Sequence, residues 1–251
     1  MIDTQTLFQI SKTKKIDQFT VLREILQISF LNYFYKNPES RNLFFKGGTC
    51  LKLLYNSNRF SEDLDFSTNQ DRKVLGEIIS KALDSLKPEF PEIYFKDVAS
   101  ITGVTEKIYL PTEITSQPLT IRLDFSQREE VFFPRQNTIS TDLPVLSVSV
   151  INYLDEKEIL SEKVRAIMTR KRGRDLYDLW FLLNKKVEFD KKLIQKKLDL
   201  YRKKYSLESL IERIDTWNEK ELIRDVSKFL PKNDRAILQN LKKFLLKELS
   251  I

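Results

Sequence analysis

Residues 43–55 read LFFKGGTCLKLLY, and residues 59–67 read RFSEDLDFS. The first stretch is a short apolar run, two adjacent glycines, and then apolar residues at helical spacing. It predicts a strand, a glycine turn and a helix. The second stretch alternates polar and apolar residues from Asp63 onward, which predicts a half-buried strand. This order of elements favours an α+β fold in which helices flank a sheet.

The pattern of the rest of the chain changes near residue 150. Before that point we predict helices over residues 16–36 and about 71–86, and short β-rich runs at 93–95, 107–110, 119–125 and 145–150. After it we predict helices at 155–172, 174–186, 189–203, 206–217, 219–229 and 234–249. We therefore expect an α/β domain over residues 1–150 and a helical bundle over residues 151–251.

Charge is divided in the same way. Residues 1–150 carry 18 Lys and Arg against 19 Asp and Glu, whereas residues 151–251 carry 25 against 17. The basic surplus of the bundle suits a polyanion such as nucleic acid, or an acidic protein partner. A lysine-rich helical face that is simply solvated is the alternative.

Two scarce residue types limit the chemistry. The chain has no histidine, which excludes Ser-His and Cys-His pairs, imidazole-bound zinc and histidine acid–base catalysis. Its single cysteine, Cys50, excludes an internal disulfide, and we expect it to be buried. Catalysis must then use carboxylates, lysines or a hard metal ion. Because the sequence has neither a secretory signal pattern nor an apolar run long enough for a bilayer, we expect a cytoplasmic protein with no membrane association.

Three aspartates are candidate metal ligands. Asp63 and Asp65 are two residues apart in a predicted strand, so their carboxylates share one face, and a bound Mg²⁺ would relieve their repulsion. Asp124 takes the polar parity of the run 121–125. If the two strands are neighbours, three carboxylates converge as in two-metal phosphoryl-transfer sites. The alternative for each aspartate is an ordinary acid on an exposed strand.

The glycine pair is a candidate phosphate site. Gly47 and Gly48 are two of only five glycines in the chain, and they stand where a strand turns into a helix. Such a turn lets backbone amides approach phosphate oxygens at a helix N-terminus. A simple tight turn is the alternative, since the segment has neither the P-loop nor the dinucleotide-fold pattern.

Two further motifs follow in the helical part, EKVRA at residues 162–166 and RDLYDL at 174–179. Together with the first two stretches, in order and spacing over about residues 43–185, they resemble the AbiEii/AbiGii abortive-infection nucleotidyltransferase toxins. That family belongs to the polymerase-beta-like nucleotidyltransferase superfamily. The resemblance implies a mixed sheet flanked by helices, a helical bundle after it, a nucleoside triphosphate substrate, and Mg²⁺ or Mn²⁺ as the metal.

The resemblance also implies roles for single residues. It assigns triphosphate binding to Gly47, Gly48 and Thr49, metal binding to Asp63 and Asp65, the third carboxylate to Asp124, and completion of the catalytic site to Lys163 and Asp178.

Residue spacing suggests further contacts. Lys163 and Arg170 are seven apart, on one face of a helix, where both could meet phosphate oxygens, and Arg174 and Asp178 are four apart and can pair. A charged helix start with a local salt bridge is the structural alternative. Arg59 and Ser61, just before the strand of Asp63, either contact phosphate or orient Asp63, and the alternative is that they only form a turn.

The leading function is transfer of a nucleoside monophosphate from a nucleoside triphosphate to an acceptor hydroxyl. The resemblance implies a toxin that acts on the 3′ end of transfer RNA, gripped by the basic bundle, and a cognate antitoxin protein. Two alternatives remain open. One keeps the chemistry and changes the acceptor to a protein or a small molecule, and the other is a non-catalytic nucleotide-binding regulatory module.

Overall fold

The computed structural model describes residues 2–100 and 103–250. The chain forms two compact units. The first, here the sheet unit, takes in the residues up to Asn56 and Phe60–Leu154; the second, here the helical unit, takes in Ser57–Arg59 and the chain from Asp155 onward.

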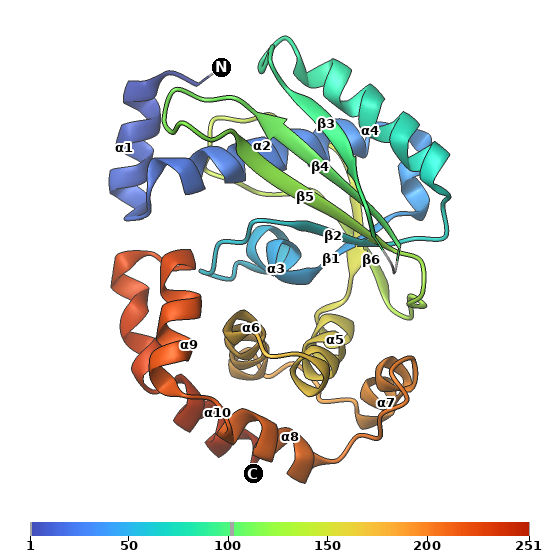
Figure 1. The fold of residues 1–251 in the computed structure, drawn as a ribbon, viewed down its shortest axis with the longest axis vertical. Coiled ribbons are helices and arrows are strands. Elements are labelled where there is room, and N and C mark those ends of the chain that lie inside the picture. Colours follow the sequence, from blue (N-terminus) through green and yellow to red (C-terminus); the bar gives the residue numbers. More distant parts are fainter. Residues whose placement is uncertain (1, 101–102, 251) are drawn as a thin grey trace. The chain divides into compact units, whose positions relative to one another are not determined.

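The sheet unit is built on a seven-stranded mixed sheet (Figure 1). Its strands, from one edge to the other, are β3 (Tyr94–Val98), β4 (Val104–Leu110), β5 (Leu119–Ser126), β2 (Leu64–Ser67), β1 (Phe44–Lys46), β7 (Ile151–Leu154) and β6 (Pro134–Asn137). The pairs β2–β5 and β1–β7 are parallel, and the other neighbours are antiparallel. The predicted α+β fold with a mixed sheet is confirmed.

The sheet unit has α-helices, of which the second packs against the apolar face of the sheet and against the first and the fourth. They are α1 (Thr4–Lys14), α2 (Gln18–Phe34), α3 (Gly47–Tyr55) and α4 (Arg72–Leu86). Phe45, Phe66 and Phe125 are cross-strand neighbours on this face, with ring centroids 5.5 and 5.1 Å apart, and Phe34 of α2 lies 5.4 Å from Phe66. Each of these buried rings contributes about 1.5–3 kcal/mol. The opposite face of the sheet, here called the polar face, carries most of the polar residues of the central strands.

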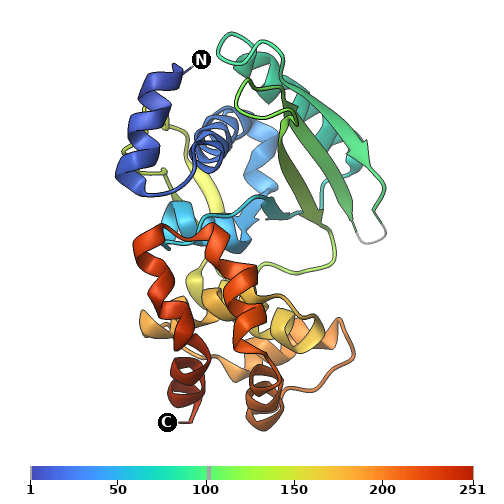
Figure 2. The same ribbon diagram turned by 60° about the vertical axis from the view of Figure 1, so that its left-hand side comes forward.

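Two elements of the sheet unit carry little apolar signal and escape sequence prediction. The helix α1, which Figure 2 shows beside α2, buries only Leu7 and Ser11. All four residues of β6 are exposed, so it lacks the apolar alternation by which strands are recognised.

The predicted strand at residues 145–150 is wrong. These residues lie outside any strand, and the strand begins at Ile151 instead. The backbone amides of Val148 and Ser149 donate to the side-chain oxygen of Asn32, at 3.0 and 3.1 Å, rather than to a neighbouring strand. Alternation alone could not reveal that α2 supplies this acceptor.

The helical unit contains α5 (Glu156–Thr169), α6 (Gly173–Asn184), α7 (Lys191–Asp199), α8 (Leu207–Asp215), α9 (Glu219–Val226) and α10 (Leu241–Leu249). Side chains of Asp155, Asp190, Ser206 and Asn218 accept hydrogen bonds from first-turn amides and fix where four of these helices begin. The single helix predicted at 234–249 is wrong. The first half is a 3-10 helix (Lys232–Gln239), and Asn240 leaves helical geometry before α10.

No helix among the described residues is both long enough and apolar enough to cross a membrane.

Candidate active site

A row of polar residues crosses the polar face of the sheet. Lys46 of β1 pairs with Asp65 of β2, Asp65 with Asp124 of β5, and Asp124 with Thr105 of β4. Directly paired residues project to the same face, and adjacent strands lie about 4.8 Å apart. The condition set by the sequence, that the strands of Asp65 and Asp124 are neighbours, is therefore met.

Arg122 is the cationic side chain that is paired with Asp124. Its hydrogen bond to Asp124 raises the pKa of the Arg122 guanidinium, and the negative charges of Asp124, Asp63 and Asp65 raise it further against the opposing effect of burial. Arg122 therefore offsets part of the negative charge of the three aspartates.

Asp124 is held in a fixed orientation. The Arg122 Nε donates to Asp124 Oδ2 at 2.7 Å, and the Thr105 hydroxyl donates to Oδ1 at 2.7 Å. A direct metal-ligand role for Asp124 stays a prediction. In the described ranges, no three acidic, histidine or cysteine side chains are already arranged around a single metal position.

Asp63 and Asp65 nevertheless fit a magnesium ion. Both are partly exposed, and carboxylate oxygens are the ligands that Mg²⁺ prefers. This ion usually takes one or two protein carboxylates and completes its shell with water and substrate phosphates. A pair of aspartates is therefore a sufficient protein donor set.

The glycine turn packs closely against Asp65 of β2. Gly47 has φ +77°, and a Cβ at this position would overlap the carboxylate oxygen Oδ2 of Asp65. Gly48 and Thr49 follow as buried residues of the first turn of α3, and the Thr49 hydroxyl donates to the carbonyl oxygen of Asp63. The turn and the aspartates are thus packed as one piece, which explains the demand for glycine at position 47.

Replacing Gly47 should therefore disturb both stability and activity. We expect Gly47→Ala to lower the free energy of unfolding by about 1–3 kcal/mol, because alanine is strained at positive φ and its methyl group would displace Asp65. Nucleotide transfer should fall at least about tenfold if Asp65 moves by a fraction of an ångström.

Urea unfolding and initial transfer rates measure the two effects. Gly76→Ala is the matched control, because Gly76 lies inside α4 with nothing within 4 Å of the added methyl group. It should stabilise the protein by about 0.5–1 kcal/mol. Unchanged stability and activity in Gly47→Ala would refute the close fit.

The segment before β2 is positioned from α2. The Gln27 side-chain amide donates to the carbonyl oxygens of Ser61 and Glu62, at 3.1 and 3.2 Å. Ser61 is thereby fixed through its backbone, two residues before Asp63. Sequence analysis missed Gln27, although a polar residue inside a largely apolar helix is a usable signal.

A buried ion pair between Lys46 and Glu129 lies at the end of the row and was also missed. Their side chains are 7% and 3% exposed. Because Lys46 directly precedes the glycine turn and pairs with Asp65, this contact ties the chain after β5 to the candidate site.

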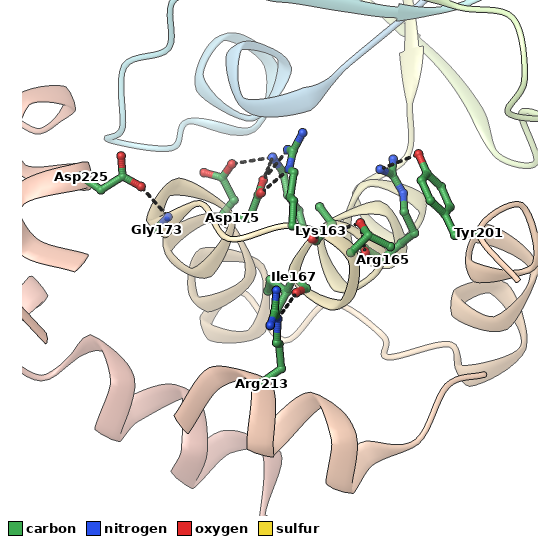
Figure 3. A network of polar contacts seen from close by, with 12 residues as sticks. Lys163, Arg165, Ile167, Gly173, Asp175, Tyr201, Arg213 and Asp225 are labelled. Carbon is green, nitrogen blue, oxygen red and sulfur yellow. Dashed lines mark hydrogen bonds and ion pairs between the residues drawn. The ribbon is translucent and has the colours of Figure 1, made fainter. Parts of the chain in front are cut away.

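A second polar cluster lies within the helical unit. Arg59 donates from Nε and Nη2 to the two oxygens of Asp178, at 2.7 and 2.8 Å. Lys163 Nζ lies 2.8 Å from Asp178 and 3.1 Å from Asp175, and Figure 3 shows Lys163 beside Asp175. Arg170 makes two hydrogen bonds to Asp175. Except for Arg170, which is 44% exposed, these side chains are at most 10% exposed.

The cluster is held in its charged state. Burial opposes the charge on Lys163, but Asp178 and Asp175 overcome it and raise the pKa of the ammonium group. Burial likewise raises the pKa of Asp178, but the neighbouring charges of Arg59 and Lys163 outweigh it and lower the pKa overall. The cluster is therefore a mutually neutralising network between α5 and α6.

The contacts predicted from helical spacing for Arg170 and Arg174 differ from those in the structure. Arg170 is not in the helix with Lys163, because α5 ends at Thr169 and Arg170 is extended, yet both reach Asp175. The Arg174 guanidinium lies 4.8 Å from the ring centre of Phe229. Triphosphate roles for Arg59, Ser61, Lys163, Arg170 and Arg174, and a catalytic role for Asp178, stay predictions.

The sheet unit thus carries aspartates on adjacent strands beside a glycine turn that opens a helix. A family model, described as nucleotidyl transferase AbiEii toxin of type IV toxin–antitoxin systems, matches residues 29–247. The chain belongs to this family. It is accordingly a nucleotidyltransferase toxin of a type IV toxin–antitoxin system, with a nucleoside triphosphate as substrate.

Solved structures share the fold. MenT4, a nucleotidyltransferase toxin from Mycobacterium tuberculosis, superposes with a TM-score of 0.68 at 16% identity, over 100% of this chain and 90% of that chain. JHP933 from Helicobacter pylori gives a TM-score of 0.52 at 20% identity, over 94% of this chain and 95% of that one. Comparison with curated protein sequences gave no match.

Proposed function

We propose that the protein is a Mg²⁺-dependent nucleotidyltransferase that adds a nucleoside monophosphate to the 3′ end of transfer RNA. The observation that carries the proposal is the register of Asp65 with Asp124 beside the Gly47 turn. Family membership supports the transfer chemistry, and the surplus of Lys and Arg after residue 150 suits an RNA acceptor.

In this proposal each part of the row has one task. Asp63 and Asp65 would hold Mg²⁺, or Mn²⁺ in its place, which supplies positive charge to the reacting phosphate. The glycine turn and the first turn of α3 would bind phosphate oxygens of the triphosphate. The acceptor hydroxyl attacks the α-phosphorus, pyrophosphate leaves, and Asp124, oriented by Arg122 and Thr105, accepts the hydroxyl proton.

The biological setting follows from the same proposal. Blocking the 3′ end of transfer RNA would stop cell growth. The reaction would take place in the cytoplasm, where the acceptor RNA and the nucleotides are found. A cognate antitoxin protein is the partner that this setting requires.

A transfer assay tests the proposal. The purified protein is incubated with Mg²⁺ and each nucleoside triphosphate in turn, labelled at the α-phosphate, together with cellular RNA or a protein fraction. We expect label in a transfer-RNA band with the wild type and none with Asp65→Asn. Asp71→Asn is the matched control, because asparagine keeps the helix cap that Asp71 gives α4.

Each other outcome is informative. Label in the protein fraction would overturn the RNA acceptor and keep the transferase chemistry. Equal label with Asp65→Asn would overturn the site. Nucleotide binding without transfer to any fraction would favour a regulatory module.

A further inference from the structure

The polar face of the sheet continues past the aspartates onto β4 and the edge strand β3, which Figures 1 and 2 show beside β5. Two residues along from Asp124, a cationic row crosses three strands: Arg122 pairs with Lys107, and Lys107 with Lys96. Two residues further, Tyr109 pairs with Tyr94. These five residues, from Arg122 to Tyr94, are here named the tyrosine–lysine platform.

The platform presents stacked rings beside ammonium groups. The rings of Tyr94 and Tyr109 are 5.1 Å apart and nearly parallel, at 8°. Lys96 Nζ lies 5.4 and 5.9 Å from the two ring centres, and Lys107 Nζ lies 5.6 Å from that of Tyr109. Tyr94 is 39% exposed and Lys96 is exposed.

Stability of the sheet edge accounts for only part of this arrangement. A cross-strand tyrosine pair stabilises a sheet, and lysine on an edge strand discourages aggregation. Within the described ranges, however, Lys96 and Lys107 form no ion pair with a carboxylate. Positive charge that is not neutralised by the protein, next to exposed aromatic faces, is complementary to a nucleic-acid strand, whose phosphates are anionic and whose bases stack.

The distance between the platform and Asp124 suits the 3′ end of a nucleic-acid strand. Tyr109 is paired with Thr120, four residues along β5 from Asp124, which is about 13 Å at 3.3 Å per residue. A few unpaired nucleotides lying along β5 could therefore reach from the tyrosines to the aspartates.

We propose that the tyrosine–lysine platform binds the unpaired 3′ end of the RNA acceptor. Bases stack on Tyr94 and Tyr109, while phosphates contact Lys96, Lys107 and Arg122. This inference rests on the proposed function and goes beyond it, because it places recognition of the acceptor end in the sheet unit. The basic surplus of the helical unit would then serve the remainder of the RNA.

Binding to two fluorescent RNA hairpins, one with an unpaired 3′ tail and one blunt, tests the platform by fluorescence anisotropy without nucleotide. We expect Tyr94→Ala to weaken binding of the tailed hairpin about tenfold and that of the blunt hairpin little. Tyr94→Phe should bind like the wild type, because the stacking ring is kept. Lys96→Ala with Lys107→Ala should reduce the salt slope of binding by about 2.

The matched control is Phe8→Ala. Phe8 is 40% exposed in α1 with Lys12 Nζ 4.4 Å from its ring centre, so it is a similar ring–lysine pair on another surface. It should leave RNA binding unchanged. Urea unfolding of every variant checks that the fold is kept.

The outcomes separate this inference from the proposed function. If the wild type labels transfer RNA but Tyr94→Ala binds the tailed hairpin as tightly as wild type, the platform alone is overturned. If the two hairpins bind equally well to the wild type, the platform is also overturned. If the wild type labels only a polypeptide, the RNA acceptor and the platform both fail, and loss of that labelling in Tyr94→Ala would reassign the platform to a protein.

Discussion

Asp65→Asn is expected to lower the rate of nucleotide transfer about 1,000-fold while leaving the protein folded. Asparagine keeps the shape of the side chain beside Gly47 but removes the charge that would hold the metal ion. Lewis-acid stabilisation of phosphoryl transfer is worth several kcal/mol, and each 1.36 kcal/mol is a factor of ten in rate.

The stability of the Asp65→Asn variant should not fall with its activity. Because Asp63, Asp65 and Asp124 repel one another in the absence of a metal, removing one charge should leave the free energy of unfolding unchanged or raise it slightly. Transfer rates and urea unfolding on the same preparations make the comparison, with Asp71→Asn as control. A variant that unfolds more easily and loses activity in proportion would show that Asp65 has only a structural role.

Asp178→Asn is expected to destabilise the protein by about 3–5 kcal/mol. The substitution leaves Arg59 and Lys163 buried with only part of their negative partner. Breaking a buried, hydrogen-bonded pair from one side is costly because the remaining charge cannot be solvated. Hydrogen exchange should show the loss of protection concentrated in α5 and α6, which carry the network.

An exposed pair of the same unit is the control. Glu221→Gln breaks the contact of Glu221 with Lys171, whose side chains are about half exposed, and should cost at most about 1 kcal/mol. If Asp178→Asn costs no more than Glu221→Gln, the network does not stabilise the helical unit. Since the pKa of Asp178 is lowered in the folded protein, its contribution should be present above the ordinary aspartate pKa and disappear when acid protonates it.

Local sequence patterns were sufficient to predict the part of the candidate site whose residues are close together in the sequence. The strand, glycine turn, helix and second strand over residues 43–67 each have their own signal, and the structure has β1, α3 and β2 there. Alternation also put Asp124 on the polar face of its strand. Convergence of the aspartates then required that this strand lie next to β2, and the register of Asp65 with Asp124 shows that it does.

Long-range partners could not be predicted in this way. Arg59 and Asp178 are 119 residues apart in sequence, and helical spacing instead suggested Arg174 as the partner of Asp178. Gln27 and Glu129 act on the site through contacts made only after the chain has folded. Such contacts depend on tertiary packing, for which residue spacing within one element carries no information.

The central claim is that Asp63 and Asp65 hold the metal of a nucleotidyltransferase. Anomalous diffraction from crystals containing Mn²⁺ and a non-hydrolysable nucleoside triphosphate tests it most directly, because Mn²⁺ scatters anomalously and accepts the same oxygen ligands. We expect a manganese peak bonded to carboxylate oxygens of Asp63 and Asp65 and to phosphate oxygens of the nucleotide. A bound nucleotide with manganese held elsewhere, or with neither aspartate as a ligand, would contradict the account.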